Sequence, residues 1–473
     1  MRARGLALRR LGSEAGGAGV TLKEIIRYAG TLYGANVAAS FVTFGLTILI
    51  SRDISRTDLG IYGLFQAYFL FGAYASGFGL APATVKWVAS GAVDDGEFLT
   101  FILTRLGAIA LLLYVGAFAA YFLHMPILAA ALVALPPYQA FNIALSAARA
   151  RLWRRREAAL LVVASLTTSA WIFGFLFIGH TYWAPVAGQV LGAYTTALVV
   201  IAYGLRQKRL RLKWPGAWRR AFWRTALPVF LGSSVFAIGE LADRLVIGHV
   251  LGLPSLGIYV MALTLFNVLN KPVHMLSRVL LSHFSQLNDG HGHAKAPEIV
   301  RLNLAVLPLM GLTAAAVLPW VIPQLLNRNF TLAFPVFAVL TVVILIKAVE
   351  LVHSSLAVAQ DSAGSNMRAQ IAALLAYAAV VFVLAERFGL IGVAWAIVLR
   401  WTVLALVQRF DMRRRGVDAL PASLLIRAAV AYLAALSFFT IAPWFMGIAY
   451  LIAGAALRLW AAPRSWRLAA RRT

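Results

Sequence analysis

The sequence predicts an all-α polytopic membrane protein with about fourteen transmembrane helices. Of the 473 residues, 61% are hydrophobic and only 13% are charged, a balance that is unknown in water-soluble domains of this size. Apolar runs of roughly 18 to 25 residues recur along the chain, and each is long enough to cross a ~30 Å hydrocarbon core as a helix. The alternating segments of ~10 residues that form a transmembrane β-barrel are missing from the sequence.

The connections between the apolar runs alternate in charge. We expect helices at 28–50, 59–81, 99–122, 126–148, 158–178, 184–205, 225–249, 256–280, 300–322, 331–358, 368–385, 389–409, 422–441 and 443–460. Lys and Arg gather at 149–156, 206–224, 413–415 and in the C-terminal tail, whereas 124–126, 179–183 and 249–254 have neither. Because basic loops stay on the cytoplasmic side, both termini are expected in the cytoplasm.

The formal charge of +26 does not indicate a nucleic-acid partner. The basic residues lie between the spans, where they fit anionic lipid headgroups better than DNA or RNA. With no cysteine in the chain, disulfides and thiolate-bound metals are excluded. His291 and His293 lie in a polar loop with glycine and are interpreted as loop residues rather than metal ligands. No metal site, no cofactor and no removable signal peptide are expected.

Two parts of the chain repeat each other. Placing residue 225 over residue 28 aligns SLGIY at 255–259 with DLGIY at 58–62, and the helix before them aligns without a gap. The number of predicted spans between the copies is even, so both copies enter the membrane in the same direction. The sequence therefore predicts two lobes related as parallel repeats.

Four segments resemble the polysaccharide or oligosaccharide flippases of the multidrug/oligosaccharidyl-lipid/polysaccharide exporter superfamily. They are LTILISRDISRTDLGIYGLF at 46–65, ALPVFLGSSVFAIGELADRLVIGHVLGLPSLGIY at 226–259, AERFGLIGVAWAIVLRW at 385–401 and AQDSAGSNMRAQ at 359–370. The resemblance implies two six-helix lobes and two further C-terminal helices around a central cavity that opens alternately to each side of the membrane.

The resemblance also implies a cargo and a location. The cargo is an undecaprenyl-pyrophosphate-linked oligosaccharide for O-antigen, capsule or exopolysaccharide, moved across the bacterial inner membrane. Coupling to H⁺ or Na⁺ is a separate expectation, which depends on the intramembrane carboxylates discussed below. Membrane lipids and other polysaccharide-assembly proteins are the further partners, and no enzymatic activity is expected. The corresponding limits are a basic N-terminal segment 1–27, a first lobe 28–205, a basic linker 206–224, a second lobe 225–410 and a C-terminal part 411–473 with the last two helices and a basic tail.

The first span has one polar face. Asn36, Ser40, Thr43 and Thr47 share this face, and the equivalent residues of the second copy are Ser233, Ala237, Glu240 and Arg244. Hydrogen bonds between helices explain small hydroxyl groups of this kind. Contact with the cargo is the alternative, and for Glu240 and Arg244 it is the favoured one.

The eighth span has a cationic face, formed by Thr264, Asn267, Lys271, His274 and Arg278 at three- and four-residue steps. A buried Lys or Arg costs at least ~2.5 kcal/mol near the bilayer centre, so this row requires water, a counter-charge or an anionic ligand. Arg278 alternatively reaches the inner headgroups.

The tenth span adds Lys347 and Glu350 on one face. A Lys–Glu pair at this depth stabilises helix packing, or else one of Glu350, Glu240 and Asp243 binds the ion that drives transport, since an intramembrane carboxylate can change its charge as access alternates. Both interpretations stay open at this point.

A pyrophosphate group binds guanidinium and ammonium donors in a cavity of low dielectric constant. We therefore predict that Arg244, Lys271, Arg278 and Lys347 bind the lipid-linked pyrophosphate, with Asn36, Asn267 and His274 along the sugar path. Arg52, Asp53, Arg56 and Asp58 are expected in a solvated turn. Arg400 and Arg427 are expected to extend to the headgroups.

Two other functions compete with the flippase. A cation-coupled multidrug or metabolite exporter of the same superfamily would have an acidic or neutral cavity, which the cationic residues of the eighth and tenth spans argue against. A membrane glycosyltransferase, ligase or polymerase would have a cluster of carboxylates or histidines at the bilayer surface and a large loop, and the sequence has neither.

Overall fold

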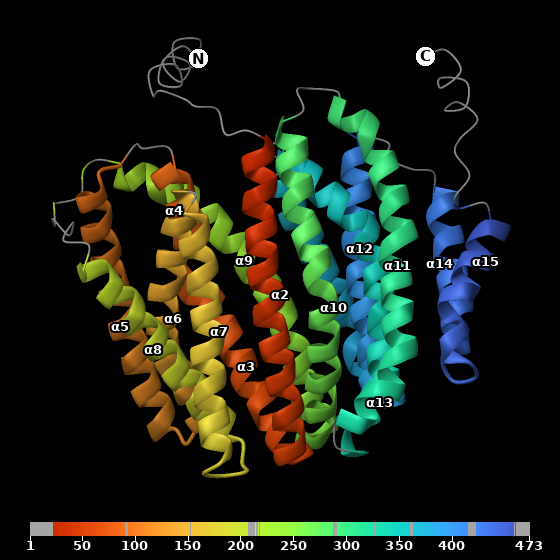
Figure 1. Cartoon of the computed structure of the whole chain (residues 1–473), viewed down its shortest axis with the longest axis horizontal. Helices are drawn as coiled ribbons and strands as arrows, with labels where there is room; N and C mark the ends of the chain where they lie inside the picture. Colours follow the sequence, from red (N-terminus) through yellow and green to blue (C-terminus); the bar gives the residue numbers. More distant parts are fainter. Residues whose placement is uncertain are drawn as a thin grey trace.

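The computed structural model describes residues 22–89, 93–151, 153–206, 213, 216, 218–286, 291–325, 328–359, 363–414, 422–457 and 459. Figure 1 shows the long helices side by side, with α5 at one end of the molecule and α14 and α15 at the other. In chain order the elements are α2 (Leu22–Asp53), α3 (Arg56–Gly77), α4 (Leu80–Ala89), α5 (Asp95–Phe122), α6 (Pro126–Ala150), α7 (Arg154–Leu176), α8 (Trp183–Arg206), α9 (Arg219–Val246), the π-helix η1 (Ile247–Leu251), α10 (Leu253–Gln286), α11 (His291–Leu325), η2 (Arg328–Phe330), α12 (Ala333–Ala359), α13 (Ala363–Arg414), α14 (Ala422–Leu436), η3 (Ser437–Phe439), η4 (Pro443–Phe445) and α15 (Met446–Ala456).

Eight of these helices, α5 to α8 and α10 to α13, are long and apolar enough to cross a membrane. α13 is broken at Gly389, whose φ of 58° and ψ of −140° are outside the helical region. The break falls between the two helices predicted at 368–385 and 389–409. The all-helical membrane fold is thus confirmed, and no strand occurs among the residues just specified. The total of about fourteen spans and the domain limits stay predictions.

The helix ends define two faces of the molecule. We call the one with Arg149, Lys213 and Arg413 the basic face, and the one with His124 and Gly252 the neutral face. The residues of the predicted N-terminal segment up to 21 and of the tail from 460 onward are outside the described residues.

The two lobes meet near the neutral face, where α3 crosses α10. A Cβ atom on Gly60 would lie 2.1 Å from the carbonyl oxygen of Leu253, and one on Gly257 would lie 2.0 Å from that of Arg56. Only glycine permits this approach of two helix backbones. Arg56 and Leu253 are equivalent positions of the repeat, as are the two glycines, so the internal symmetry relates both contacts. The predicted parallel repeat is confirmed.

The turn before α3 strengthens this contact. Ser55 caps α3 by accepting the backbone N–H of Asp58, and Asp58 in turn accepts the backbone N–H of Tyr182 at 3.3 Å. Arg52 donates from Nη2 to the carbonyl oxygen of Gln324 on α11 at 3.0 Å. The predicted solvated turn therefore also joins the first lobe to the second.

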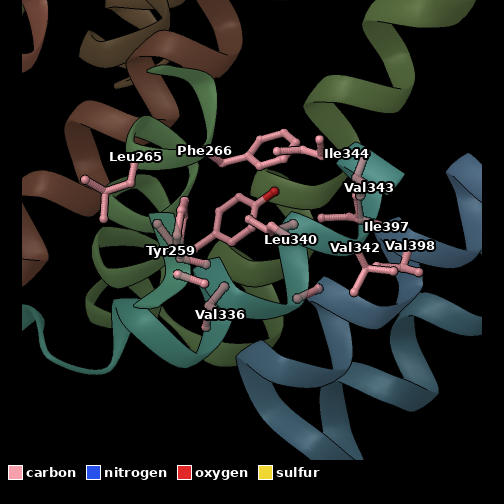
Figure 2. Close-up of a cluster of buried hydrophobic side chains, with 14 of the residues drawn as sticks. Tyr259, Leu265, Phe266, Val336, Leu340, Val342, Val343, Ile344, Ile397 and Val398 are labelled. Carbon is pink, nitrogen blue, oxygen red and sulfur yellow. The ribbon is translucent and has the colours of Figure 1, made fainter. Parts of the chain in front are cut away.

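The core of the second lobe lies between α10, α12 and α13. Figure 2 shows Tyr259 and Phe266 of α10 against Leu340 and Ile344 of α12, with Ile397 of α13 behind them. The last two helices pack on the outside of this lobe. Tyr432 of α14 donates to Thr341 of α12 at 2.8 Å, and Tyr450 of α15 donates to the Leu304 carbonyl of α11 at 2.7 Å.

A second contact between the lobes lies toward the basic face. The span formed by α3 and α4 is interrupted at Phe78 and Gly79, which have φ values of 43° and 67°. This break packs against the start of α9: a Cβ atom on Gly79 would lie 2.2 Å from the Ala226 carbonyl oxygen. The rings of Phe78 and Phe230 stack with their centroids 5.1 Å apart. α3 therefore contacts the second lobe near both faces.

The described part of the basic linker is bound to the first lobe at the start of α5. Glu97 accepts the backbone N–H of Gly216 at 3.1 Å and the indole N–H of Trp218 at 2.7 Å. The Lys213 ammonium lies 3.0 Å from Oδ2 of Asp94, the N-cap residue of α5. That ammonium, followed by the backbone N–H of Gly96, lowers the pKa of Asp94 below its ordinary value.

We expect Gly257→Ala to lower the free energy of unfolding by about 1–3 kcal/mol, because its methyl group would overlap the Arg56 carbonyl and force α3 and α10 apart. Thermal unfolding of the purified protein in detergent measures this loss. Gly107→Ala is the matched control, since a Cβ atom there meets nothing within 4 Å and alanine favours the helix. Equal stability of the two variants would contradict the close crossing.

Asp94→Asn should lower thermal stability slightly at neutral pH and not at all in acid. Because the folded-state pKa of Asp94 is lowered, the stability that its charge contributes is present above the ordinary pKa and is lost as the pH falls through the folded value. Melting curves of wild type and variant should differ by a constant amount between about pH 5 and 8 and converge below about pH 4. Curves that stay apart in acid would assign the effect to the N-cap hydrogen bonds alone.

Candidate functional site

Six ionisable side chains gather in the second lobe. They are Glu240, Asp243 and Arg244 of α9, Lys347 and Glu350 of α12, and Arg400 of α13. We call these six residues the charged cluster. Its three acidic and three basic groups carry equal and opposite charge, which lowers the free-energy cost of burying charged side chains in a membrane-spanning lobe.

Arg400 is paired inside the lobe rather than directed to the headgroups. Its Nη2 lies 3.3 Å from Oε1 of Glu240, with side chains that are 6% and 30% exposed. Gly239 makes room for it, since a Cβ atom at that position would lie 2.5 Å from Nη2. The guanidinium also lies 6.0 Å from the centre of the Trp401 ring. The prediction that Arg400 extends to the headgroups was wrong, because a carboxylate and an aromatic ring are nearer.

Lys347 is enclosed by three helices and is only 3% exposed. Its ammonium donates to Oδ1 of Asn270 on α10 at 3.1 Å and lies 4.2 Å from the centre of the Trp401 ring. The charges of Glu350 and Glu240 attract it, and that of Arg400 repels it. In this conformation Lys347 is a counter-charge for Glu240 and Glu350 and contacts α10 and α13. Its predicted contact with pyrophosphate stays a prediction.

Asp243 and Arg244 lie next to the first lobe. Asp243 accepts hydrogen bonds from the Tyr259 hydroxyl and, at 2.7 Å, from the backbone N–H of Arg244. Arg244 is 8% exposed, and its Nε and Nη1 atoms have no hydrogen-bond partner among the described residues. The charge of Arg244 interacts electrostatically with Tyr62 of α3. The charge of Glu240 interacts in the same way with Tyr74 of α3. The cluster therefore faces the first lobe through α3.

The two unpartnered nitrogens of Arg244 matter energetically. A buried donor without an acceptor costs about 1–3 kcal/mol, and more when the group is charged. An anion that reaches Arg244 can accept hydrogen bonds from these two nitrogens. No other residue of the charged cluster has unpartnered buried nitrogen or oxygen atoms in the described part of the chain.

Glu350 lies inside the second lobe between α12 and α13. Gln408 of α13 donates from Nε2 to Oε1 of Glu350 at 3.4 Å and to Oδ1 of Asn366 at 3.0 Å. All three carboxylates of the cluster thus have donors or cations beside them. Whether any of them couples transport to an ion stays a prediction.

α10 presents a polar face that is open. Asn267 and Lys271, one turn apart, are both exposed, while Asn270 and Val273 on the opposite side are buried. Polar groups of this kind are costly against acyl chains, so this face requires an aqueous space. The side chains of Asn36, His274 and Arg278, which were predicted to share that space, are outside the described part of the structure.

The polar face of α2 serves the helix itself at two of its positions. The hydroxyls of Thr43 and Thr47 donate to the carbonyl oxygens of Ala39 and Thr43, one turn back, at 2.8 and 2.9 Å. These bonds favour the structural interpretation of the two threonines over contact with the cargo.

Sequence reasoning missed two residues of the site, Trp401 and Gly239. Trp401 contacts both Lys347 and Arg400, and Gly239 provides the space for Arg400. A signal was present in the sequence, since Arg400 is a charge near the middle of the apolar span predicted at 389–409, and such a charge requires a partner. The identity of that partner depends on which helices are neighbours.

Comparisons with known proteins agree with this architecture. A family model described as "Polysaccharide biosynthesis protein" matches residues 49–333, more than half of the chain. A search of curated proteins by sequence finds no match.

Solved structures are similar in fold. The lipid II flippase MurJ in an inward closed conformation aligns with a TM-score of 0.69 at 15% identity, over 91% of this chain and 98% of that one. A multidrug resistance MATE family transporter of the MOP superfamily in an inward-facing conformation aligns with a TM-score of 0.63 at 16% identity, over 80% and 93%. The MATE multidrug transporter DinF-BH gives a TM-score of 0.62 at 15% identity, over 86% and 99%. The chain therefore belongs to the polysaccharide biosynthesis protein family, and its fold is that of the multidrug/oligosaccharidyl-lipid/polysaccharide exporter superfamily of flippases and transporters.

Proposed function

We propose that the protein is a flippase that moves an undecaprenyl-pyrophosphate-linked oligosaccharide across the bacterial inner membrane by alternating access. The observation that carries this proposal is the buried guanidinium of Arg244 beside the first lobe, two of whose nitrogens lack an acceptor among the described residues. A guanidinium binds phosphate oxygens in pairs, and its charge is permanent. A pyrophosphate group supplies the acceptors that the described part of the chain does not.

The exposed face of α10 supports the same cargo. Lys271 and Asn267 expose an ammonium and an amide on one face of α10, and an anionic headgroup followed by sugars requires donors of these two kinds. Arg278, His274 and Asn36 extend this set by sequence position alone. The basic loops favour an orientation with both termini in the cytoplasm, so that the cargo is moved to the periplasmic leaflet.

Alternating access requires contacts between the lobes that separate in turn. The Gly60–Gly257 crossing joins the lobes near the neutral face, and the packing of Gly79 on α9 joins them toward the basic face. Separation at either place would give Arg244 access to water or to a ligand. Of the carboxylates, Glu240 is the one beside α3 through Tyr74, and we propose it, with Asp243 and Glu350, as the group through which H⁺ or Na⁺ drives the cycle.

Lys271→Ala should reduce translocation at least about tenfold, because a charge-assisted hydrogen bond of about 1.5–3 kcal/mol to the pyrophosphate is lost. Proteoliposomes containing undecaprenyl-pyrophosphate-linked oligosaccharide, with a lectin outside to report exposed sugar, measure the rate. Arg427→Ala removes an exposed cation of α14 and is the control. Wild-type rates in a well-folded Lys271→Ala protein would rule out the pyrophosphate contact. Efflux of a cationic dye without lipid movement would favour a drug exporter.

Lys347→Met should destabilise the protein by about 3–5 kcal/mol, because it leaves Glu240 and Glu350 with one counter-charge fewer in a buried site. The double variant Lys347→Met with Glu350→Gln should recover part of the loss. Thermal unfolding measures both. If Lys347→Met is as stable as wild type but binds the lipid-linked oligosaccharide more weakly, Lys347 is a substrate ligand, as the sequence predicts, rather than a structural cation.

A further inference from the structure

α9 carries two neighbouring carboxylates, and a pair of this kind is a typical binding site for an inorganic cation such as Na⁺. Glu240 and Asp243 are one turn apart on the same helix, and their charges repel each other. The equivalent residues of the first lobe are Thr43 and Leu46, so the acidic pair belongs to the second lobe alone. In a membrane such a pair requires a nearby positive charge.

We infer that the guanidinium of Arg400 is the built-in cation of this acidic pair and excludes Na⁺ from it. Arg400 contacts Glu240 at 3.3 Å, and its charge also acts on Asp243. Because an arginine stays protonated in proteins, this cation is permanent and is not released into solution. The inference goes beyond the proposed cargo and stands without it, and it restricts the coupling ion proposed above for Glu240 and Asp243 to H⁺.

The backbone of α9 is adapted to this arrangement. Gly239 precedes Glu240, and any side chain there would overlap the guanidinium, with a Cβ atom 2.5 Å from Nη2 and 2.6 Å from Cζ. Glycine is a poor helix former, so its presence within α9 requires a packing reason. Room for the guanidinium of Arg400 supplies that reason.

The charges around Glu240 and Asp243 disfavour the binding of a further cation in addition to Arg400. Lys347 of α12 is attracted to Glu240 and Glu350 and is repelled by Arg400. Among the described residues, the charge of Glu240 also acts on Tyr74 of α3 and Tyr377 of α13, and a tyrosine hydroxyl adds no positive charge. With three acidic and three basic side chains, a bound Na⁺ would give the cluster a net positive charge in a medium of low dielectric constant.

The test is the dependence of thermal unfolding on Na⁺, measured on the full-length protein in detergent with choline replacing Na⁺ at constant ionic strength. Wild type should melt at the same temperature in both salts. Arg400→Gln should melt lower in choline and regain at least about 2 °C with saturating Na⁺, because the uncompensated carboxylates then bind the ion. Arg427→Gln, an exposed cation remote from α9, should respond as wild type does. Saturable stabilisation of wild type by Na⁺, or a folded Arg400→Gln protein without any Na⁺ response, would overturn the inference.

Two further variants decide the matter if Arg400→Gln does not fold. Glu240→Gln with Arg400→Gln removes both partners and should fold with near wild-type stability and no Na⁺ response. Gly239→Ala should displace the guanidinium without deleting it, and so should give a smaller Na⁺-dependent gain than Arg400→Gln. A double variant that is as unstable as the single one would overturn the role of Arg400 as the counter-ion of Glu240. None of these measurements uses the lipid cargo, so failure of the proposed function would leave their outcome unchanged.

Discussion

The contact between the backbones of α3 and α10 is the constraint on which the rest of the structure depends. At Gly60 and Gly257 the two helices approach so closely that each glycine faces a carbonyl oxygen of the other lobe. In a membrane there is little hydrophobic gain from pressing apolar helices together, so association depends on close packing of small residues. The two glycines therefore determine how closely α3 and α10 approach each other.

That contact determines how the charged cluster is placed. α3 carries Tyr62 and Tyr74 along the side of α9, and these tyrosines are the first-lobe groups on which Arg244 and Glu240 act. Glu240 and Arg244 therefore lie beside α3 at the border between the lobes, whereas Lys347 and Glu350 lie inside the second lobe. In the proposed alternating access the lobes separate at this border, which is the position where a charge responds to such a movement.

The six charges have unequal roles because their surroundings differ. Lys347, Arg400 and Glu350 have partners on neighbouring helices of the same lobe. Arg244 has buried nitrogens without one among the described residues. Permanent pairs stabilise one arrangement of helices, whereas an unsatisfied donor favours whatever ligand completes it. This difference distinguishes the residues that maintain the lobe from Arg244, the residue available to the anionic cargo proposed above.

The sequence by itself determined the membrane class, the helical fold, the parallel repeat and the division of α13 into two spans, because hydrophobic length and internal similarity can be recognised along the chain. The exact residue of the break, Gly389, came from the structure. It also singled out the charges of α9 and α12, since an ion in an apolar span is conspicuous. Only the tertiary structure decided their partners. Arg400 was expected at the headgroups, yet it pairs with Glu240, which is 160 residues earlier in the chain. A charged side chain in a low-dielectric interior pairs with the nearest opposite charge. Helix packing, not position along the chain, determines which residue that is.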